Sequence, residues 1–204
     1  NTILNSKDNL IQSVENTKNI HVEYVSANPT GPLHIGHGRG MILGEVTAKF
    51  LSYQGHKIVR EYYVNDAGRQ IDLLLVSVLL CHLGKNKHIF VDEKSNNDGH
   101  LVTYKGNYVN DVAISLSHDL EKIDKDSVLD LLNEPIDSLI SFLKTQKSYF
   151  EIRNALVDII INDYIEKDLS AVGINFDSWF RESQLYETGL LDEVLLSIKN
   201  KNLS

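Results

Sequence analysis

Hydrophobic and polar positions along residues 18–70 predict a strand, a helix and a second strand. Residues 20–25 alternate β-branched or aromatic side chains with polar ones, which is typical of a strand. From Ile35 the apolar residues recur at helical spacing, and Gly55 is expected to end that helix. Residues 57–64 predict the second strand. A strand, helix and strand in this order indicate a right-handed βαβ unit and a parallel sheet. The expected apolar face of the helix consists of Ile42, Leu43, Val46, Phe50 and Leu51.

Most of the remaining chain has helical periodicity. Helices are expected over residues 5–17, 68–83, 107–120, 126–133, 135–171 and 187–199. Residues 84–106 are polar and predict a long loop, and residues 174–177 predict a strand or an extended segment. Acidic side chains outnumber basic ones across residues 111–140, which is typical of a solvated face. The predicted fold class is therefore α/β, with a parallel sheet and a long, mostly helical segment that is acidic in part.

The loop between the first strand and its helix is rich in glycine and proline. Five of the twelve glycines fall between Gly31 and Gly44, and two of the three prolines, Pro29 and Pro32, come just before or among them. Backbone N–H groups at the start of a helix can bind phosphate, and glycine lets a ligand approach the backbone closely. In open α/β sheets, ligands bind at the carboxyl ends of the strands. This loop is therefore the candidate nucleotide site.

Two histidines stand at that helix start, in the sequence His34-Ile35-Gly36-His37. Side chains three residues apart share one helix face, so both imidazoles can meet the same ligand. Their N–H groups can contact phosphate oxygens without a permanent charge, and Gly36 leaves room for a base or a ribose. Such a site can stabilise the charge that develops when an α-phosphate is attacked and pyrophosphate leaves. An innocent pair of surface histidines is the alternative. A zinc site is a weaker interpretation of the two histidines, because the sequence places no obvious carboxylate or cysteine partner near them.

Composition narrows the function classes. The chain has 204 residues, 28 acidic and 20 basic, for a net charge of −8, which argues against this segment as a main nucleic-acid surface. The single cysteine, Cys81, excludes an intrachain disulfide and a cysteine-rich zinc site, and fits a cytoplasmic location. No apolar run is long enough to span a membrane, so we expect no membrane partner.

Residues 22–40, Val-Glu-Tyr-Val-Ser-Ala-Asn-Pro-Thr-Gly-Pro-Leu-His-Ile-Gly-His-Gly-Arg-Gly, resemble the signature of bacterial-type arginyl-tRNA synthetases. These are class I aminoacyl-tRNA synthetases, and the His-Ile-Gly-His tetrapeptide marks the class. Residues 60–71, 104–109 and 176–183 resemble further family blocks in the same order. The resemblance covers roughly residues 18–200. Pantothenate synthetase shares the His-x-Gly-His turn, but the Ser-Ala-Asn-Pro-Thr turn and the Phe-Asp-x-Trp block distinguish the chain from it.

The resemblance implies roles for individual residues, beginning with the two substrates. Glu23 would bind the guanidinium of L-arginine, Asn28 would bind its α-ammonium, and Ser26 would line the same pocket. These residues also have purely structural alternatives. Glu23 could be a solvated side chain of the strand, and Ser26 and Asn28 could cap the turn. His34 would contact both substrates and act in catalysis with His37. ATP would be bound by His34, Gly36, His37 and Gly38.

Three residues at the end of the second strand complete the expected site. Asp66, Gly68 and Gln70 would shape the pocket wall. ATP would enter with Mg²⁺ as a substrate, and no protein-bound zinc is expected.

The resemblance also implies a domain plan and a set of partners. Residues 1–17 would be the tail of an N-terminal domain or a linker helix, and 18–70 the first βαβ part of a Rossmann-like catalytic domain. Residues 71–150 would be an acidic and mostly helical insertion, and 151–204 the return to the catalytic domain. The chain would then be the first half of a catalytic domain, inactive by itself, from a monomeric protein that charges tRNA(Arg) with arginine. A standalone binding module without catalysis is the alternative from another class. No loop of the family's Lys-Met-Ser-Lys type occurs in these residues.

Overall fold

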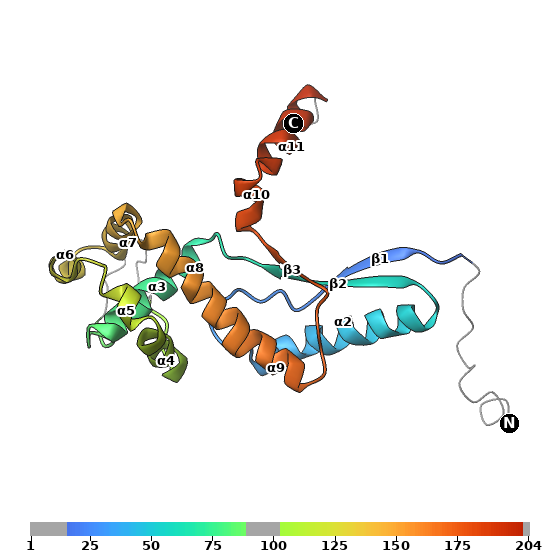
Figure 1. Cartoon of the computed structure of the whole chain (residues 1–204), viewed down its shortest axis with the longest axis horizontal. Helices are drawn as coiled ribbons and strands as arrows, with labels where there is room; N and C mark the ends of the chain where they lie inside the picture. The colour runs from blue at the N-terminus through green and yellow to red at the C-terminus, as the bar shows by residue number, and fades with distance from the viewer. Residues whose placement is uncertain (1–15, 89–102, 202–204) are drawn as a thin grey trace, which may run out of the picture. The chain divides into compact units, whose positions relative to one another are not determined.

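The computed structural model describes residues 16–88 and 103–201, which fall into two compact units (Figure 1). Unit 1 comprises the described residues of Asn1–Asn28, Leu33–Asn65 and Asp168–Ser204, and unit 2 those of Pro29–Pro32 and Asp66–Lys167. The expected helix over 5–17 lies outside the described residues except for positions 16 and 17, which are not helical. Residues 89–102 of the expected loop also lie outside them.

Unit 1 is built on a parallel sheet of three strands in the described residues. The strands are β1 (Asn19–Glu23), β2 (Lys57–Val64) and β3 (Ser178–Arg181), in the order β1-β2-β3. Val22 pairs with Arg60, and Tyr62 pairs with Trp179 on the other side of β2. The parallel β1–β2 pair confirms the sheet expected from the strand–helix–strand pattern.

Helix α2 (Ile35–Tyr53) connects β1 to β2 and runs along one face of the sheet (Figure 1). Its expected apolar face is wrong: Ile42, Leu43, Val46 and Phe50 are all more than half exposed in the described structure. The buried positions of α2 are Glu45 and Ala48. The helix therefore faces the sheet with small residues and one carboxylate. Two contacts explain this arrangement.

The first contact is between Gly44 and Tyr24, the residue after β1. A Cβ atom at Gly44 would lie 2.2 Å from Tyr24 Cγ, so only glycine allows the helix to come this close to the tyrosine ring. The Tyr24 ring in turn lies 4.6 Å from that of Phe176, measured between centroids. This stack of helix, tyrosine and phenylalanine sets the distance between α2 and the sheet.

The second contact is the buried carboxylate of Glu45. It accepts a hydrogen bond from the Tyr24 hydroxyl and pairs with Arg60 Nε and Lys49 Nζ, each at 3.2 Å. Burial raises the pKa of Glu45, but the hydrogen bonds from Tyr24, Lys49 and Arg60 outweigh it and leave the pKa below its usual value. Because Glu45 is charged and paired, it can occupy a position that the periodicity assigned to an exposed face.

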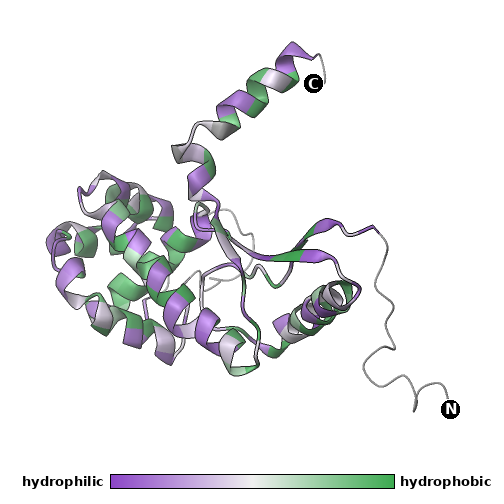
Figure 2. Ribbon diagram, turned by 45° about the vertical axis from the view of Figure 1, so that its right-hand side comes forward, coloured by the Kyte–Doolittle hydropathy of each residue, from purple (hydrophilic) through white to green (hydrophobic). Residues whose placement is uncertain are grey.

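The C-terminal part of unit 1 differs in detail from the sequence pattern. Residues 174–177, expected as a strand or an extended segment, are not part of a strand, and β3 begins directly after them at Ser178. The expected helix over 187–199 corresponds to α11 (Leu190–Asn200), which begins after Gly189, a residue in a left-handed conformation with φ +71°. A short helix that was not expected, α10 (Ser183–Glu187), precedes it. Green and purple bands alternate along α11, the helix that ends at the C mark in Figure 2, and several of its apolar side chains are exposed.

Unit 2 is helical in its described residues. Its elements are α3 (Arg69–His82), α4 (Asn107–Ser115), α5 (Ser117–Leu120), α6 (Lys125–Asp130), the 3-10 turn η1 (Leu131–Asn133), α7 (Ile136–Thr145), α8 (Tyr149–Ile159) and the π-helical η2 (Ile160–Ile165). Helix α9 (Glu166–Ala171) begins in unit 2 and ends in unit 1. Residues 135–171, expected to form one or two long helices, are interrupted between α7 and α8. Helix α3 is buried on nearly every side against α4, α5, α7 and α8, which explains its continuous apolar run.

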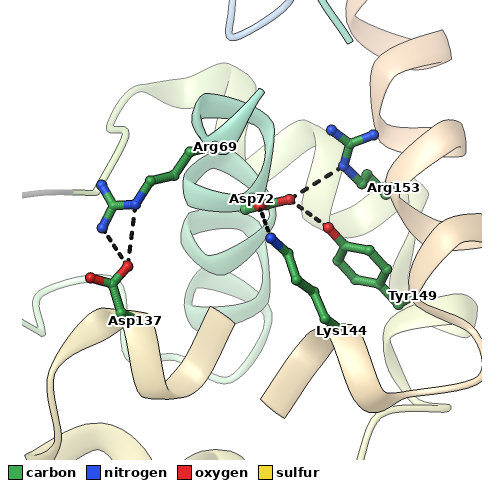
Figure 3. Close-up of polar contacts among 6 residues, drawn as sticks. All are labelled: Arg69, Asp72, Asp137, Lys144, Tyr149 and Arg153. Carbon is green, nitrogen blue, oxygen red and sulfur yellow. Dashed lines mark hydrogen bonds and ion pairs between the residues drawn. The ribbon is translucent and has the colours of Figure 1, made fainter. Parts of the chain in front are cut away.

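A buried acid ties three helices of unit 2 together (Figure 3). Asp72 on α3 accepts a hydrogen bond from the Tyr149 hydroxyl at 2.6 Å. It also pairs with Lys144 Nζ at 2.9 Å and Arg153 Nε at 3.3 Å, from α7 and α8. Only 4% of Asp72 is exposed, so these partners replace the water that the carboxylate loses on folding. Within the ranges that the structure describes, no helix is long and apolar enough to cross a membrane.

Candidate functional site

The turn that follows β1 has an unusual backbone. Val25 and Ser26 have φ angles of +65° and +40°, although neither is glycine. A positive φ is costly for a β-branched residue such as Val25. Strained residues of this kind persist only where the surroundings hold them, and they cluster at functional sites. The turn lies at the carboxyl end of β1, which pairs in parallel with β2, and α/β sheets bind ligands at such strand ends.

Helix α2 begins with a capping box made of two histidines. The His34 ring accepts a hydrogen bond at Nδ1 from Gly36 N at 3.1 Å, and the His37 ring accepts one at Nδ1 from His34 N at 3.2 Å. The two rings stack with centroids 3.8 Å apart. A Cβ atom at Gly36 would lie 2.8 Å from His34 Cε1, so glycine is needed here to admit the His34 ring. The sequence had assigned that space to a ligand.

These hydrogen bonds fix the chemistry of both rings. An Nδ1 atom that accepts a backbone hydrogen bond carries no proton, so each neutral imidazole holds its proton on Nε2. Desolvation, followed by the charge of neighbouring His34, lowers the pKa of the His37 ring below its usual value. The site thus offers Nε2–H donors beside the positive end of the α2 dipole, an arrangement suited to phosphate oxygens.

A cavity of about 380 Å³ opens beside the histidines in unit 1. Its lining includes three of the four expected ATP residues, His34, His37 and Gly38. The other lining residues are Leu33, Ile35, Met41, Asp168, Ala171 and Val172. The last three come from around the end of α9, more than a hundred residues away in the chain, and local sequence carries no signal for their proximity.

The residues of unit 1 that are expected to bind the substrate arginine lie around the turn after β1. Glu23 ends β1 and is exposed, and its carboxylate has no hydrogen bond or ion pair with the residues described. Ser26 Oγ accepts a hydrogen bond from Tyr63 N at 3.1 Å, so this hydroxyl also supports the turn. Asn28 is exposed at the end of the turn. A free carboxylate beside a polar turn suits a cationic ligand, and the three roles stay predictions.

The expected wall residues belong to unit 2. Asp66 is buried, Gly68 is the N-cap of α3 and Gln70 is exposed in the first turn of that helix. Their part in a pocket stays a prediction. Among residues 16–88 and 103–201, no three His, Cys, Asp or Glu side chains gather as a metal site requires.

The segment Pro29–Pro32 is held within unit 2 by Tyr108. The Tyr108 hydroxyl donates a hydrogen bond to Thr30 O at 2.9 Å, and a Cβ atom at Gly31 would lie 3.0 Å from its ring. Burial raises the pKa of Tyr108 to about 12, so the hydroxyl stays protonated and able to donate. Tyr108 lies in residues 104–109, one of the blocks whose resemblance to the synthetase family was noted above, and the structure gives it a physical task.

The parallel sheet and the crossover helix between its first two strands define an α/β fold of the Rossmann-like class. Residues 1–204 match the family model described as tRNA synthetases class I (R), catalytic domain. The chain belongs to that family.

Individual relatives agree with the family match. The chain is 36% identical over 190 residues to an arginine–tRNA ligase of Acidithiobacillus ferrooxidans, covering 88% of the chain and 32% of the relative. It is 38% identical over 193 residues to an arginine–tRNA ligase of Coxiella burnetii, covering 86% of the chain and 31% of the relative. The chain therefore spans about a third of the length of these curated relatives.

Solved structures show the same fold. A Campylobacter jejuni protein assigned as an arginyl-tRNA synthetase superposes with a TM-score of 0.64 at 30% identity, covering 98% of this chain and 38% of its own. The Thermus thermophilus arginyl-tRNA synthetase superposes with a TM-score of 0.54 at 21% identity, covering 93% of this chain and 28% of its own, and it supports the fold alone. The expected Rossmann-like α/β class is thereby confirmed.

Proposed function

We propose that this chain supplies part of the catalytic domain of an arginine–tRNA ligase. The activity would join L-arginine to ATP, forming arginyl-adenylate, and then transfer arginine to tRNA(Arg). The observation that carries the proposal is the pair of histidines that forms the capping box at the start of α2, in a chain that belongs to the synthetase family. ATP would enter as its Mg²⁺ complex. A monomeric protein acting in the cytoplasm completes the proposal.

The histidines would act on the phosphates of ATP. When the arginine carboxylate attacks the α-phosphorus, the bond from that phosphorus to the bridging oxygen breaks and pyrophosphate leaves. The Nε2–H groups of His34 and His37 would donate to oxygens whose negative charge grows in this step. Donors that are already oriented by the capping box need no rearrangement as the charge develops, which is the condition for transition-state stabilisation.

The turn after β1 would select the amino acid. Glu23 offers an exposed, unpaired carboxylate to a planar guanidinium, which can form two parallel charge-assisted hydrogen bonds. Asn28 would accept from the α-ammonium, and Ser26 would line the pocket. This division of labour separates the two substrates, with arginine at the turn and ATP at the helix start.

The test is arginine-dependent exchange of pyrophosphate into ATP, with tRNA(Arg) present. It should be run on the complete natural polypeptide that contains these residues and on residues 1–204 alone. Citrulline is the matched control, because it keeps the shape of arginine but replaces the charged guanidinium by a neutral group. We expect exchange with arginine and none with citrulline in the complete polypeptide. We expect none from residues 1–204, in which no loop of the Lys-Met-Ser-Lys type occurs.

The results separate the alternatives. A complete polypeptide that binds tRNA(Arg) but exchanges no pyrophosphate would support a binding module and overturn the enzyme proposal. Exchange by residues 1–204 at a rate typical of synthetases would show that the chain is sufficient by itself. Equal exchange with arginine and citrulline would remove the role given to Glu23.

A further inference from the structure

The strained turn after β1 is held by two consecutive residues of β2. The Tyr62 hydroxyl donates a hydrogen bond to Ala27 O at 2.9 Å, and Tyr63 N donates one to Ser26 Oγ at 3.1 Å. Tyr62 and Ala27 are 35 positions apart in the sequence. The turn also has a local bond from Ser26 N to Tyr24 O at 3.0 Å. Positive φ angles at Val25 and Ser26 therefore persist because the neighbouring strand fixes the turn from outside.

Tyr62 is a rigid support for this turn. Its side chain is fully buried, and its ring stacks on Trp179 at a centroid distance of 4.5 Å. Phe176 meets the same ring edge-on at 5.4 Å. A phenol packed on both sides in this way holds its hydroxyl at one point, so the atom that it binds is fixed as well.

The atom that Tyr62 binds controls the direction of Asn28. Ala27 O belongs to the peptide unit that joins Ala27 to Asn28, and a peptide unit is planar. A hydrogen bond to the oxygen therefore restricts the rotation of this plane, and with it the positions of the N–H and Cα of Asn28. Tyr62 itself is buried beneath the turn, so it can act on a ligand only through this peptide.

We propose that Tyr62 is a positioning residue for the amino-acid substrate, because its hydrogen bond to Ala27 O orients the peptide that presents Asn28. The inference rests on the proposed function and goes beyond it by naming a buried residue that tunes arginine recognition. It separates Tyr62 from the ATP site, since the histidines are held by their own capping box at the start of α2.

The test replaces Tyr62 by phenylalanine in the complete natural polypeptide that contains this chain. Tyr62→Phe keeps the packed ring and removes only the hydroxyl. The matched control is Tyr149→Phe, which removes another buried phenol hydroxyl, the one that donates to Asp72 in unit 2. Pyrophosphate exchange gives the KM for arginine and for ATP, and thermal unfolding gives the Tm of each variant.

We expect Tyr62→Phe to raise the KM for arginine about tenfold, the effect of losing one buried hydrogen bond and leaving its acceptor unpaired. The KM for ATP should change less than about twofold, because the α2 start is held independently. Tyr149→Phe should lower the Tm and leave both KM values unchanged. Replacing Tyr62 by 4-aminophenylalanine, which keeps an N–H donor at the same point of the ring, should restore the KM for arginine.

Three results would overturn the inference. An arginine KM within about twofold of the unchanged protein, with only the Tm lowered, makes Tyr62 a core residue alone. Equal increases in both KM values assign Tyr62 to the whole site. Failure of 4-aminophenylalanine to rescue removes the hydrogen bond as the cause. If the unchanged protein shows no arginine-dependent exchange, the proposed function itself fails, and that result is distinct from all three.

Discussion

The rings of His34 and His37 stack at a centroid distance of 3.8 Å while each accepts a hydrogen bond from a backbone N–H of the same helix start. The pair thus has two tasks that use different nitrogens. The Nδ1 atoms cap helix α2, and the Nε2 atoms remain as donors for a ligand. Substitutions can separate these tasks, because some side chains cap a helix without offering an imidazole.

Asparagine at position 34 should preserve the stability of the chain better than alanine does. Both substitutions should lower the activity. His34→Ala removes the N-cap and should lower the free energy of unfolding by about 1 kcal/mol, whereas asparagine is a good N-cap residue and should nearly preserve it. Both variants lack the Nε2–H donor, so kcat of the complete polypeptide should fall about 10²-fold in each. Thermal unfolding and pyrophosphate exchange measure the two effects. Full activity of His34→Asn would reduce His34 to a capping residue.

His37 should make stability depend on pH in a defined direction. In the unfolded chain its pKa is near the ordinary value of about 6.5, and in the folded chain the pKa is lower. As the pH falls through 6.5, the unfolded state therefore binds the proton first, and folding loses stability. The contribution of His37 is fully present above about pH 6.5 and is lost as the pH falls toward the folded pKa.

The check is the unfolding midpoint of the chain between pH 7.5 and pH 5, compared with that of His37→Gln. Glutamine is a usual capping-box partner at this third helical position and does not titrate, so the variant should lose less stability in the acid range. Identical pH profiles for the two proteins would contradict the assignment.

Glu23 should distinguish the two substrates. Glu23→Gln keeps the shape of the side chain and removes the charge that would pair with the guanidinium, so the KM for arginine should rise by about 10- to 100-fold. The KM for ATP should stay nearly constant. Glu193→Gln, which neutralises an exposed acid on α11, is the control for net charge and should change neither value. A rise confined to the KM for ATP would place Glu23 in a different part of the site.

Asp72 and Asp137 should differ greatly in their effect on stability, although both are paired carboxylates on unit 2 (Figure 3). Asp72→Asn leaves the buried Arg153 without its charged partner and should lower the free energy of unfolding by about 3 kcal/mol. Asp137 pairs with Arg69 at 2.6 Å, but both side chains are 54% exposed, and Asp137→Asn should cost less than about 1 kcal/mol. Chemical denaturation of the chain measures both, and equal losses would show that burial does not set the strength of these pairs.

Local patterns predicted much of the fold and the place of the site. The bounds of β2 agree with the expected ones because β-branched and aromatic residues make up most of the segment, and the helix starting at Ile35 follows from the turn that precedes it. The face of α2 was mispredicted because periodicity counts apolar residues and is blind to a paired acid such as Glu45. The start of α11 at Leu190 depends on the left-handed φ angle of Gly189, which helical spacing does not encode.

The supporting contacts of the site could not be predicted for a related reason. The hydrogen bond from Tyr62 to Ala27 O and the approach of Ala171 to the histidines join segments that are far apart in the sequence. Such contacts are set by strand register and chain topology, and one sequence without relatives carries little trace of them. The histidines could be found because their spacing, the nearby glycines and the helix start all lie within a few residues.

Gly44 turns a missing side chain into a constraint on the whole site. Its contact with Tyr24 lies about two and a half turns from the start of α2, roughly 14 Å along the axis from the histidines. A residue with a Cβ atom at position 44 would push α2 away from Tyr24 and tilt the helix. A small tilt at this position would displace the imidazoles at the N-terminal end of the helix. The placement of the two histidine rings therefore depends on a position outside the pocket that they line. A search for improved catalysts that is confined to pocket residues would overlook Gly44.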